Sequence, residues 1–249
     1  SVGYYSLPYN TTGQHNTAVG DYTLLTNKEN HRSIAIGYKA MYYADNRTTG
    51  RITYNTAIGY NALGGSTIAE NNTGRANTAT GYYSLRINTS GDYNTANGYL
   101  ALSSNTTGSF NTAHGVDALT SNTTGKNNTA IGRSSMYYNT TGSSNIAIGS
   151  KALVSNTDRS NLVAIGDSAL YNNGVGATEY YHATANTAIG SKALSSNTTG
   201  YENTATGYKS LYSNTIGGNN TATGYLSLYN NTSGLSNTAN GYLSLSDNT

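Results

Sequence analysis

The chain has 249 residues, of which 10% are charged and 36% hydrophobic, and its formal net charge is +2. Both fractions lie below those of ordinary globular domains. The scattered, nearly balanced charge leaves no basic stripe for a phosphate backbone, so we expect no nucleic-acid binding. Absence of cysteine excludes disulfides and thiol chemistry. No apolar run approaches the roughly 18 residues that a membrane-spanning helix needs.

Fourteen glycines recur in register, and ten of the thirteen intervals between them are 17 residues long. The other three intervals are 22, 22 and 24 residues. A short period sustained over the whole chain is typical of a repeat architecture. The glycines are Gly3, Gly20, Gly37, Gly59, Gly81, Gly98, Gly115, Gly132, Gly149, Gly166, Gly190, Gly207, Gly224 and Gly241.

The repeating unit reads G-Y-x-[AS]-[LM]-x-x-N-T-T-G-x-x-N-T-A-x, as residues 98–114 illustrate. A 17-residue unit is too short for two helices, and its Asn, Thr and Gly are poor helix formers. Its β-branched and aromatic residues suit strands, and N-T-T-G suits a turn. The sequence predicts an all-β parallel β-solenoid (β-roll) of about 14 coils, stacked about 4.8 Å apart. We expect residues 1–249 to be one continuous array, a segment of a longer fibre.

Equivalent residues should lie above one another in such a stack. The fifth position is Leu or Met in every unit, and Ala stands before the last position, so these columns should fill the interior. We expect the repeat glycine to be a corner that needs positive φ or close backbone approach. An amide ladder is predicted for one asparagine column, which includes Asn55, Asn77, Asn94, Asn111 and Asn128.

The last position of the unit is often β-branched and apolar. Because one leucine and two small residues per coil bury little surface, we favour a column that points outward to meet other chains. The alternative is that it lines a larger core. The apolar members are Val19, Ile36, Ile58, Ile131, Ile148, Ile165 and Ile189.

The segments N-T-A-I-G-Y-x-A-L, from Asn55 to Leu63, and N-I-A-I-G-S-K-A-L, from Asn145 to Leu153, resemble the head repeats of trimeric autotransporter adhesins (YadA-like heads). Bacterial and phage fibre proteins carry similar arrays. The resemblance implies a left-handed parallel β-roll, a homotrimer, an extracellular or cell-surface location and an adhesive role. This chain departs from the family in its longer unit and its often polar last position, as at His114.

No constellation of reactive residues is evident. The four histidines His15, His31, His114 and His182 lie in different columns or in an insertion, and Asp does not recur with the repeat. We therefore expect no catalysis, cofactor or metal. Tyrosine is the notable side chain: 24 are present, many directly after the repeat glycine. Stacked tyrosines could grip sugar rings, or they could stiffen the array, which we favour.

Three insertions occupy residues 42–54, 64–76 and 171–185, each between the Leu column and the next Asn. Insertions into repeats often form the binding face, but they are also tolerated at exposed corners without function. Candidate ligand contacts within them are Tyr42, Tyr43, Arg47, Arg51, Tyr54, Arg75, Tyr180, Tyr181 and His182.

The repeat also creates twelve N-x-[ST] sequons, several of them at one corner. Glycans there would coat one edge of the array. The candidate glycosylation sites are Asn10, Asn88, Asn105, Asn122, Asn139 and Asn197.

The leading functional hypothesis is a structural and adhesive extracellular fibre segment, rod-like, self-associating as a homotrimer or filament, with a host surface or glycan as partner. One alternative is an ice-binding solenoid that uses a threonine column. A phage tail-fibre shaft that binds a receptor is another. The threonine column includes Thr106, Thr123, Thr140 and Thr198.

Overall fold

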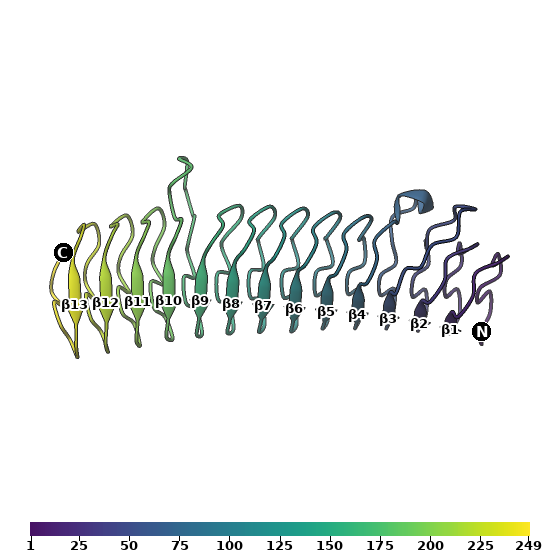
Figure 1. Ribbon diagram of the computed structural model, residues 1–249. Coiled ribbons are helices and arrows are strands. Elements are labelled where there is room, and N and C mark those ends of the chain that lie inside the picture. Colours follow the sequence, from purple (N-terminus) through teal and green to yellow (C-terminus); the bar gives the residue numbers. More distant parts are fainter. The chain divides into compact units, whose positions relative to one another are not determined.

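A computed structural model describes all 249 residues, and the chain is an all-β parallel β-solenoid of about 13 coils of about 17 residues (Figure 1). The predicted fold class is confirmed. The coils fall into two compact units, residues 1–126 and 127–249, and each unit is described by itself. In both, every coil contributes one strand of three residues, and consecutive strands pair in parallel.

In the first unit, each strand pairs with the next so that equivalent repeat positions face one another, for example Ala96 with Ala113. A single turn of 3-10 helix, η1 (Ala69–Asn71), lies in the second insertion. The strands are β1 (Thr17–Val19), β2 (Ile34–Ile36), β3 (Thr56–Ile58), β4 (Thr78–Thr80), β5 (Thr95–Asn97) and β6 (Thr112–His114).

The second unit repeats the arrangement, and its register is kept across the third insertion, since Ala164 still pairs with Ala188. Its strands are β7 (Thr129–Ile131), β8 (Ile146–Ile148), β9 (Val163–Ile165), β10 (Thr187–Ile189), β11 (Thr204–Thr206), β12 (Thr221–Thr223) and β13 (Thr238–Asn240).

The structure has one complete coil fewer than the fourteen expected, because the first repeat is incomplete. Only Ser1 and Val2 precede Gly3, so the first repeat has no room for a full strand. Val2 instead forms an isolated parallel bridge with Val19.

The strand alternation decides which columns form the core. The central alanine of each strand points inward and is buried, as are the leucines of the fifth position in the interior coils. The flanking strand residues point outward: Ile58 is 40% exposed and Ile148 is 36% exposed. The last-position column is therefore an outer surface, and the alternative of a larger core is wrong.

Left-handed backbone at non-glycine residues is a regular feature of the coil. A regular coil has three such positions, with φ of 57° at Leu100, 52° at Leu102 and 60° at Phe110. Each costs about 1–2 kcal/mol for an L-residue. The conformation persists because it aims the backbone at the adjacent coils: Leu100 N–H donates to Tyr82 O at 2.9 Å, and Leu102 N–H donates to Ala118 O at 3.0 Å.

The repeat glycine meets both expectations set for it. Gly98 has φ of 146°, and a Cβ added there would lie 2.3 Å from the carbonyl oxygen of Gly115 in the next coil. Any side chain would push adjacent coils apart and break the strand pairing beside it.

We expect Gly98→Ala to lower the free energy of unfolding by several kcal/mol, because strained φ and a backbone collision add together. The control is Gly176→Ala, where φ is 73° and nothing lies within 4 Å of an added Cβ; it should cost about 1–2 kcal/mol. Urea unfolding followed by circular dichroism measures both. Equal losses in the two variants would contradict close coil packing at Gly98.

Candidate functional site

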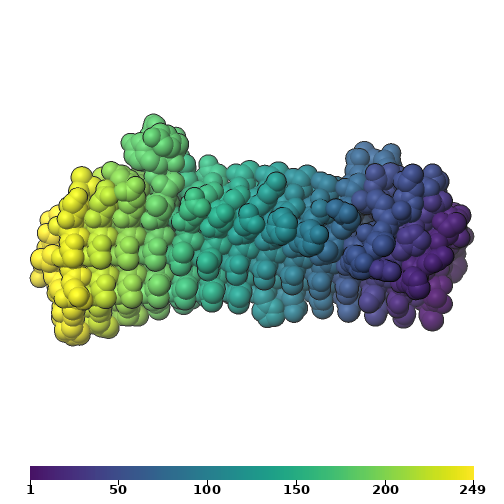
Figure 2. Space-filling view, viewed as in Figure 1, coloured from purple at the N-terminus to yellow at the C-terminus, as the bar shows by residue number.

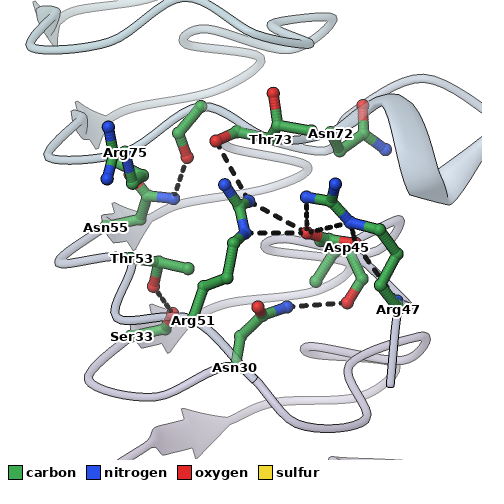
Figure 3. Close-up of polar contacts among 12 residues, drawn as sticks. Asn30, Ser33, Asp45, Arg47, Arg51, Thr53, Asn55, Asn72, Thr73 and Arg75 are labelled. Atoms are coloured by element: carbon green, nitrogen blue, oxygen red, sulfur yellow. Dashed lines mark hydrogen bonds and ion pairs between the residues drawn. The ribbon is translucent and has the colours of Figure 1, made fainter. Parts of the chain in front are cut away.

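Asp45 is the centre of a buried polar cluster in the first insertion (Figure 3). Its side chain is only 1% exposed. Arg47 donates from Nε to Oδ1 at 3.0 Å and from Nη2 to Oδ2 at 2.6 Å. Arg51 approaches Oδ2 with Nη2 at 2.9 Å and donates to it from Nε at 3.2 Å. Both carboxylate oxygens are therefore occupied by guanidinium groups.

Two opposing effects set the charge of this carboxyl. Burial on its own would raise the pKa of Asp45, because removal from water penalises the charged form. The hydrogen bonds from Arg47 and the positive charges of Arg47 and Arg51 together outweigh burial and hold the pKa of Asp45 below its usual value. The group is thus a permanent ion-pair partner and not a general acid or base near neutral pH.

The cluster locks the first insertion to the coils on either side. Asn30 Nδ2 donates to the backbone oxygen of Asp45 at 2.7 Å, and Arg51 Nη2 donates to the backbone oxygen of Thr73 at 3.0 Å. The hydroxyls of Ser33 and Thr53 are 2.6 Å apart. These bonds tie the insertion to residues of the neighbouring coils, so the cluster acts as a structural clamp.

A cavity of about 30 Å³ lies beside this clamp, lined by Asn27, Asp45, Asn55 and Asn88 among others. Oδ1 of Asn27 is buried there without a protein partner. Such a volume suits a water molecule and is far below that of an organic ligand site.

The other candidate contacts of the first two insertions have separate partners. Tyr42 meets Tyr43 edge to face, with ring centroids 4.6 Å apart. Tyr54 accepts a hydrogen bond from Arg32 Nη1 at 2.7 Å. Arg75 pairs with Asp92 at 4.0 Å. These contacts do not draw the side chains to one site.

The third insertion is different, because two of its candidate residues, Tyr181 and His182, line the same groove. It stands out from the surface of the second unit as a finger, green in Figure 2. Tyr180, in this insertion, is 87% exposed. Tyr181 and His182 line an open groove of about 360 Å³ together with residues from the following coils, namely Thr199, Tyr201, Ile216, Ser233 and Leu235.

The tyrosines after the repeat glycines form stacked ladders. In the first unit the rings of Tyr38, Tyr60 and Tyr82 follow at 5.2 and 5.1 Å between centroids. In the second unit Tyr208 and Tyr225 stack at 5.4 Å. Each ring covers the face of the next, so a sugar could stack face-on only at the end of a ladder. This geometry favours the interpretation that the stacked tyrosines stiffen the array over the interpretation that they bind sugar rings.

The corner asparagines form a second amide ladder, which the sequence analysis interpreted only as sequons. Asn105 Nδ2 donates to Asn88 Oδ1 at 2.7 Å and to Gly108 O at 2.9 Å. Asn122 Nδ2 in turn donates to Asn105 Oδ1 at 2.7 Å. Five of the six candidate glycosylation sites are buried: Asn88, Asn105, Asn122, Asn139 and Asn197.

The buried nitrogens argue against glycosylation of the folded array, because a glycan would have to replace a hydrogen that this ladder uses. The predicted ladder in the other asparagine column is present as well. Asn94 Nδ2 donates to Asn77 Oδ1 at 3.1 Å and to Gly108 O at 2.8 Å.

Sequence reasoning missed residues that organise the clamp around Asp45 and the groove beside the third insertion. Asp45 could have been found as the single acidic residue of an insertion that carries two arginines. The groove could have been found at the repeat position that Tyr201 occupies, because the polar side chains that other coils carry at this position are absent there. No group of three or more His, Cys, Asp or Glu side chains is placed to hold a metal ion. The structure also contains no helix that is both long and apolar enough to cross a bilayer.

Comparisons with known proteins assign no family to this chain. It matches no protein-family model, and a search of curated proteins finds no match. The parallel β-solenoid is therefore the class that the fold defines. The left-handed coil and the trimer implied by the resemblance to adhesin heads stay predictions.

We expect Asp45→Asn to destabilise the first unit by about 1–2 kcal/mol at neutral pH, because two partly exposed guanidinium groups lose their anion. Since the pKa of Asp45 is lowered by folding, its contribution is complete above the unfolded value of about 3.9 and is lost as pH falls through the folded value. The difference between wild type and variant should therefore narrow below about pH 4.

Urea unfolding at a series of pH values measures this effect. Asp158→Asn is the matched control, because Asp158 pairs with Arg159 but is 51% exposed; it should change stability by less than about 0.5 kcal/mol. A gap between wild type and Asp45→Asn that stays constant from pH 7 to below pH 4 would contradict the clamp.

We expect Asn105→Asp to cost about 3 kcal/mol or more, because it buries a carboxylate against two acceptor oxygens and removes two donors. Asn71→Asp, at an exposed asparagine of the second insertion, is the control and should be nearly neutral. Chemical denaturation compares the two. Equal stability of both variants would show that the corner amides are not a buried ladder.

Proposed function

We propose that this chain is a structural and adhesive segment of an extracellular fibre, without a catalytic role. The observation that carries the proposal is the outer face of the parallel sheet in each unit. Two columns of flanking strand residues cover it, most of them threonine, isoleucine or valine, and none of them is Lys, Arg, Asp or Glu. Surfaces of this kind are suited to contact with other chains.

Self-association on this face would supply the burial that a thin coil lacks. Ile34 and Ile36 are 40% and 37% exposed, and Ile146 and Ile148 are 39% and 36% exposed. In-register strands keep the outward side chains in two columns, so a second copy can contact the same two positions of every coil. Closed symmetric assemblies and filaments both arise from such repeated contacts.

The location and the adhesive role rest on two further observations. The N-T-A-I-G-Y and N-I-A-I-G-S segments resemble adhesin head repeats, and those segments form the strand and glycine corner of each coil. The third insertion projects from the array and lines a groove. A shaft of a phage tail fibre would use the same features.

Ice binding is the second candidate, favoured by the outward threonine pairs of the second unit. Thr204, Thr221 and Thr223 are exposed on the outer face of β11 and β12. The threonine column at the corner of the coil is less suitable for ice binding, because Thr106 Oγ1 already donates to Thr123 O at 3.0 Å. Measurement of thermal hysteresis decides between the candidates: a freezing-point gap at micromolar concentration would support ice binding over adhesion.

We expect the wild-type chain to form oligomers and the double variant Ile146→Lys/Ile148→Lys to be a monomer, because lysines on the outer face bring like charges and desolvation costs into the contact. Ala147 between them remains buried, so the coil should stay folded. Sedimentation velocity over a range of concentrations measures the oligomeric state, and circular dichroism checks the fold.

The control variant is Thr141→Lys/Thr157→Lys, which places two lysines at exposed corner positions away from β8. It should assemble like the wild type. A wild-type chain that remains monomeric at the highest soluble concentration would contradict self-association through this face.

A further inference from the structure

The groove beside the third insertion is made where one repeat column changes its chemistry. Tyr201, Gly218 and Leu235 occupy equivalent positions in three successive coils of the second unit. Thr199, Ile216 and Ser233 form the neighbouring column and line the same groove. In other coils the first column carries a short or polar side chain, as at Asp92, Ser109, Ser143 and Ser160.

Those polar side chains have a regular structural role. Asp92, Ser109 and Ser160 each accept a hydrogen bond from the backbone N–H of the equivalent residue one coil earlier. Asp92 N–H donates to Ser109 Oγ at 3.0 Å, and Ser143 N–H donates to Ser160 Oγ at 2.9 Å. Arg75 N–H likewise donates to Asp92 Oδ1 at 2.7 Å.

The groove lacks these acceptors. Gly218 has no side chain to accept from the N–H of Tyr201, and Leu235 has only an apolar one to offer the N–H of Gly218. Two backbone donors are therefore left without the side-chain acceptor that Asp92, Ser109 and Ser160 supply in other coils. Gly218 itself is buried, and unpaired donors at such a place cost stability unless something else satisfies them.

The missing side chain also shapes the groove. A Cβ on Gly218 would lie 3.1 Å from the Tyr201 ring, so that ring packs over the glycine. Tyr181 meets Tyr201 edge to face, with centroids 5.5 Å apart. Ile216 and Leu235 are 55% and 59% exposed. The groove therefore has an aromatic wall and an aliphatic surface, and the backbone N–H groups of Tyr201 and Gly218 lie beside them without a side-chain acceptor.

We propose that this groove binds a neutral oligosaccharide. A sugar ring has an apolar face that packs on tyrosine and leucine, and oxygen atoms that accept from backbone N–H groups and tyrosine hydroxyls. The charged residues that border the groove in sequence, Glu179 and Glu202, are acidic and exposed, which disfavours anionic ligands. Three coils span about 10 Å, so the groove should contact more than one sugar unit of the oligosaccharide. The inference rests on the adhesive function proposed above and names its ligand class.

Isothermal titration calorimetry of the whole chain with cellotetraose and with tetra-N-acetylchitotetraose tests the proposal. We expect saturable binding of at least one of them, with nuclear magnetic resonance shifts at Tyr201, Ile216 and Leu235. Gly218→Ser should weaken binding at least about tenfold, a loss of about 1.4 kcal/mol, because its side chain fills the hollow and accepts from Tyr201 N–H.

Stability separates this effect from misfolding. Since serine restores the acceptor found at Ser109 and Ser160 while its Cβ makes the Tyr201 ring shift by a few tenths of an ångström, Gly218→Ser should melt at a temperature close to that of the wild type. Ser160→Gly is the matched control: it removes the acceptor in a coil outside the groove, so it should lower stability and leave the affinity unchanged.

The proposal is overturned if neither oligosaccharide binds at millimolar concentration, if only a sulfated oligosaccharide binds, or if Gly218→Ser binds as tightly as the wild type. None of these results bears on self-association, which sedimentation measures separately. Loss of sugar binding with intact oligomers would thus reject the groove alone, whereas monomers that bind sugar would reject the self-associating fibre and keep the groove.

Discussion

Hydrogen bonding between equivalent positions of adjacent coils is the constraint on which this structure depends. Backbone groups at the strand and at the left-handed positions pair with the coil before or after, and two buried asparagine columns repeat the pattern with side-chain amides, as at Asn94 and Asn105. The amide of Asn105 donates within its own coil and to the coil before it, whereas the amide of Asn94 donates to the coils on either side. Because buried polar groups are costly when unpaired, one register satisfies them all, and slippage by a single residue leaves every column mismatched.

This constraint explains why a chain with so few apolar residues folds into an ordered structure. The interior needs only one leucine and one or two small residues per coil, because the polar ladders occupy the remaining volume and pair most of their own donors and acceptors. It also explains the clamp at Asp45. Where the first insertion replaces the corner asparagine, the ladder stops, and an ion pair with two arginines holds the coils instead. The unpartnered Oδ1 of Asn27 marks the place where the ladder ends.

The fold could be predicted because a repeat provides its own internal alignment. Period, strand position, inward Leu and Ala columns and the glycine corner all follow from comparing units such as residues 98–114 with one another. Left-handed φ at Leu102 could not be predicted, because leucine has no intrinsic preference for it; only the neighbouring coils favour it. The corner asparagines were misinterpreted for a related reason. An N-T-T-G sequence fits a solvated turn, and burial of Asn105 depends on side chains that lie 17 residues away.

The candidate sites were less predictable than the fold, because they depend on departures from the repeat. Tyr181 and His182 were identified from the insertion, yet the groove that they line also depends on Gly218 and Leu235, which have no polar side chain at a position where most coils carry one. Within a periodic structure, a position that gives up a regular hydrogen bond is a stronger indication of a binding site than an exposed tyrosine, since the array loses stability there.

The in-register amide ladder is tested most directly by scalar coupling across its hydrogen bonds. Nuclear magnetic resonance can detect coupling between the side-chain nitrogen of Asn105 and the side-chain carbonyl carbon of Asn88, and between the corresponding atoms of Asn122 and Asn105. The structure predicts measurable couplings for both pairs, together with side-chain amide protons that exchange slowly with water. Absent couplings and rapidly exchanging amides in a folded sample would contradict the ladder and the stacked register that depends on it.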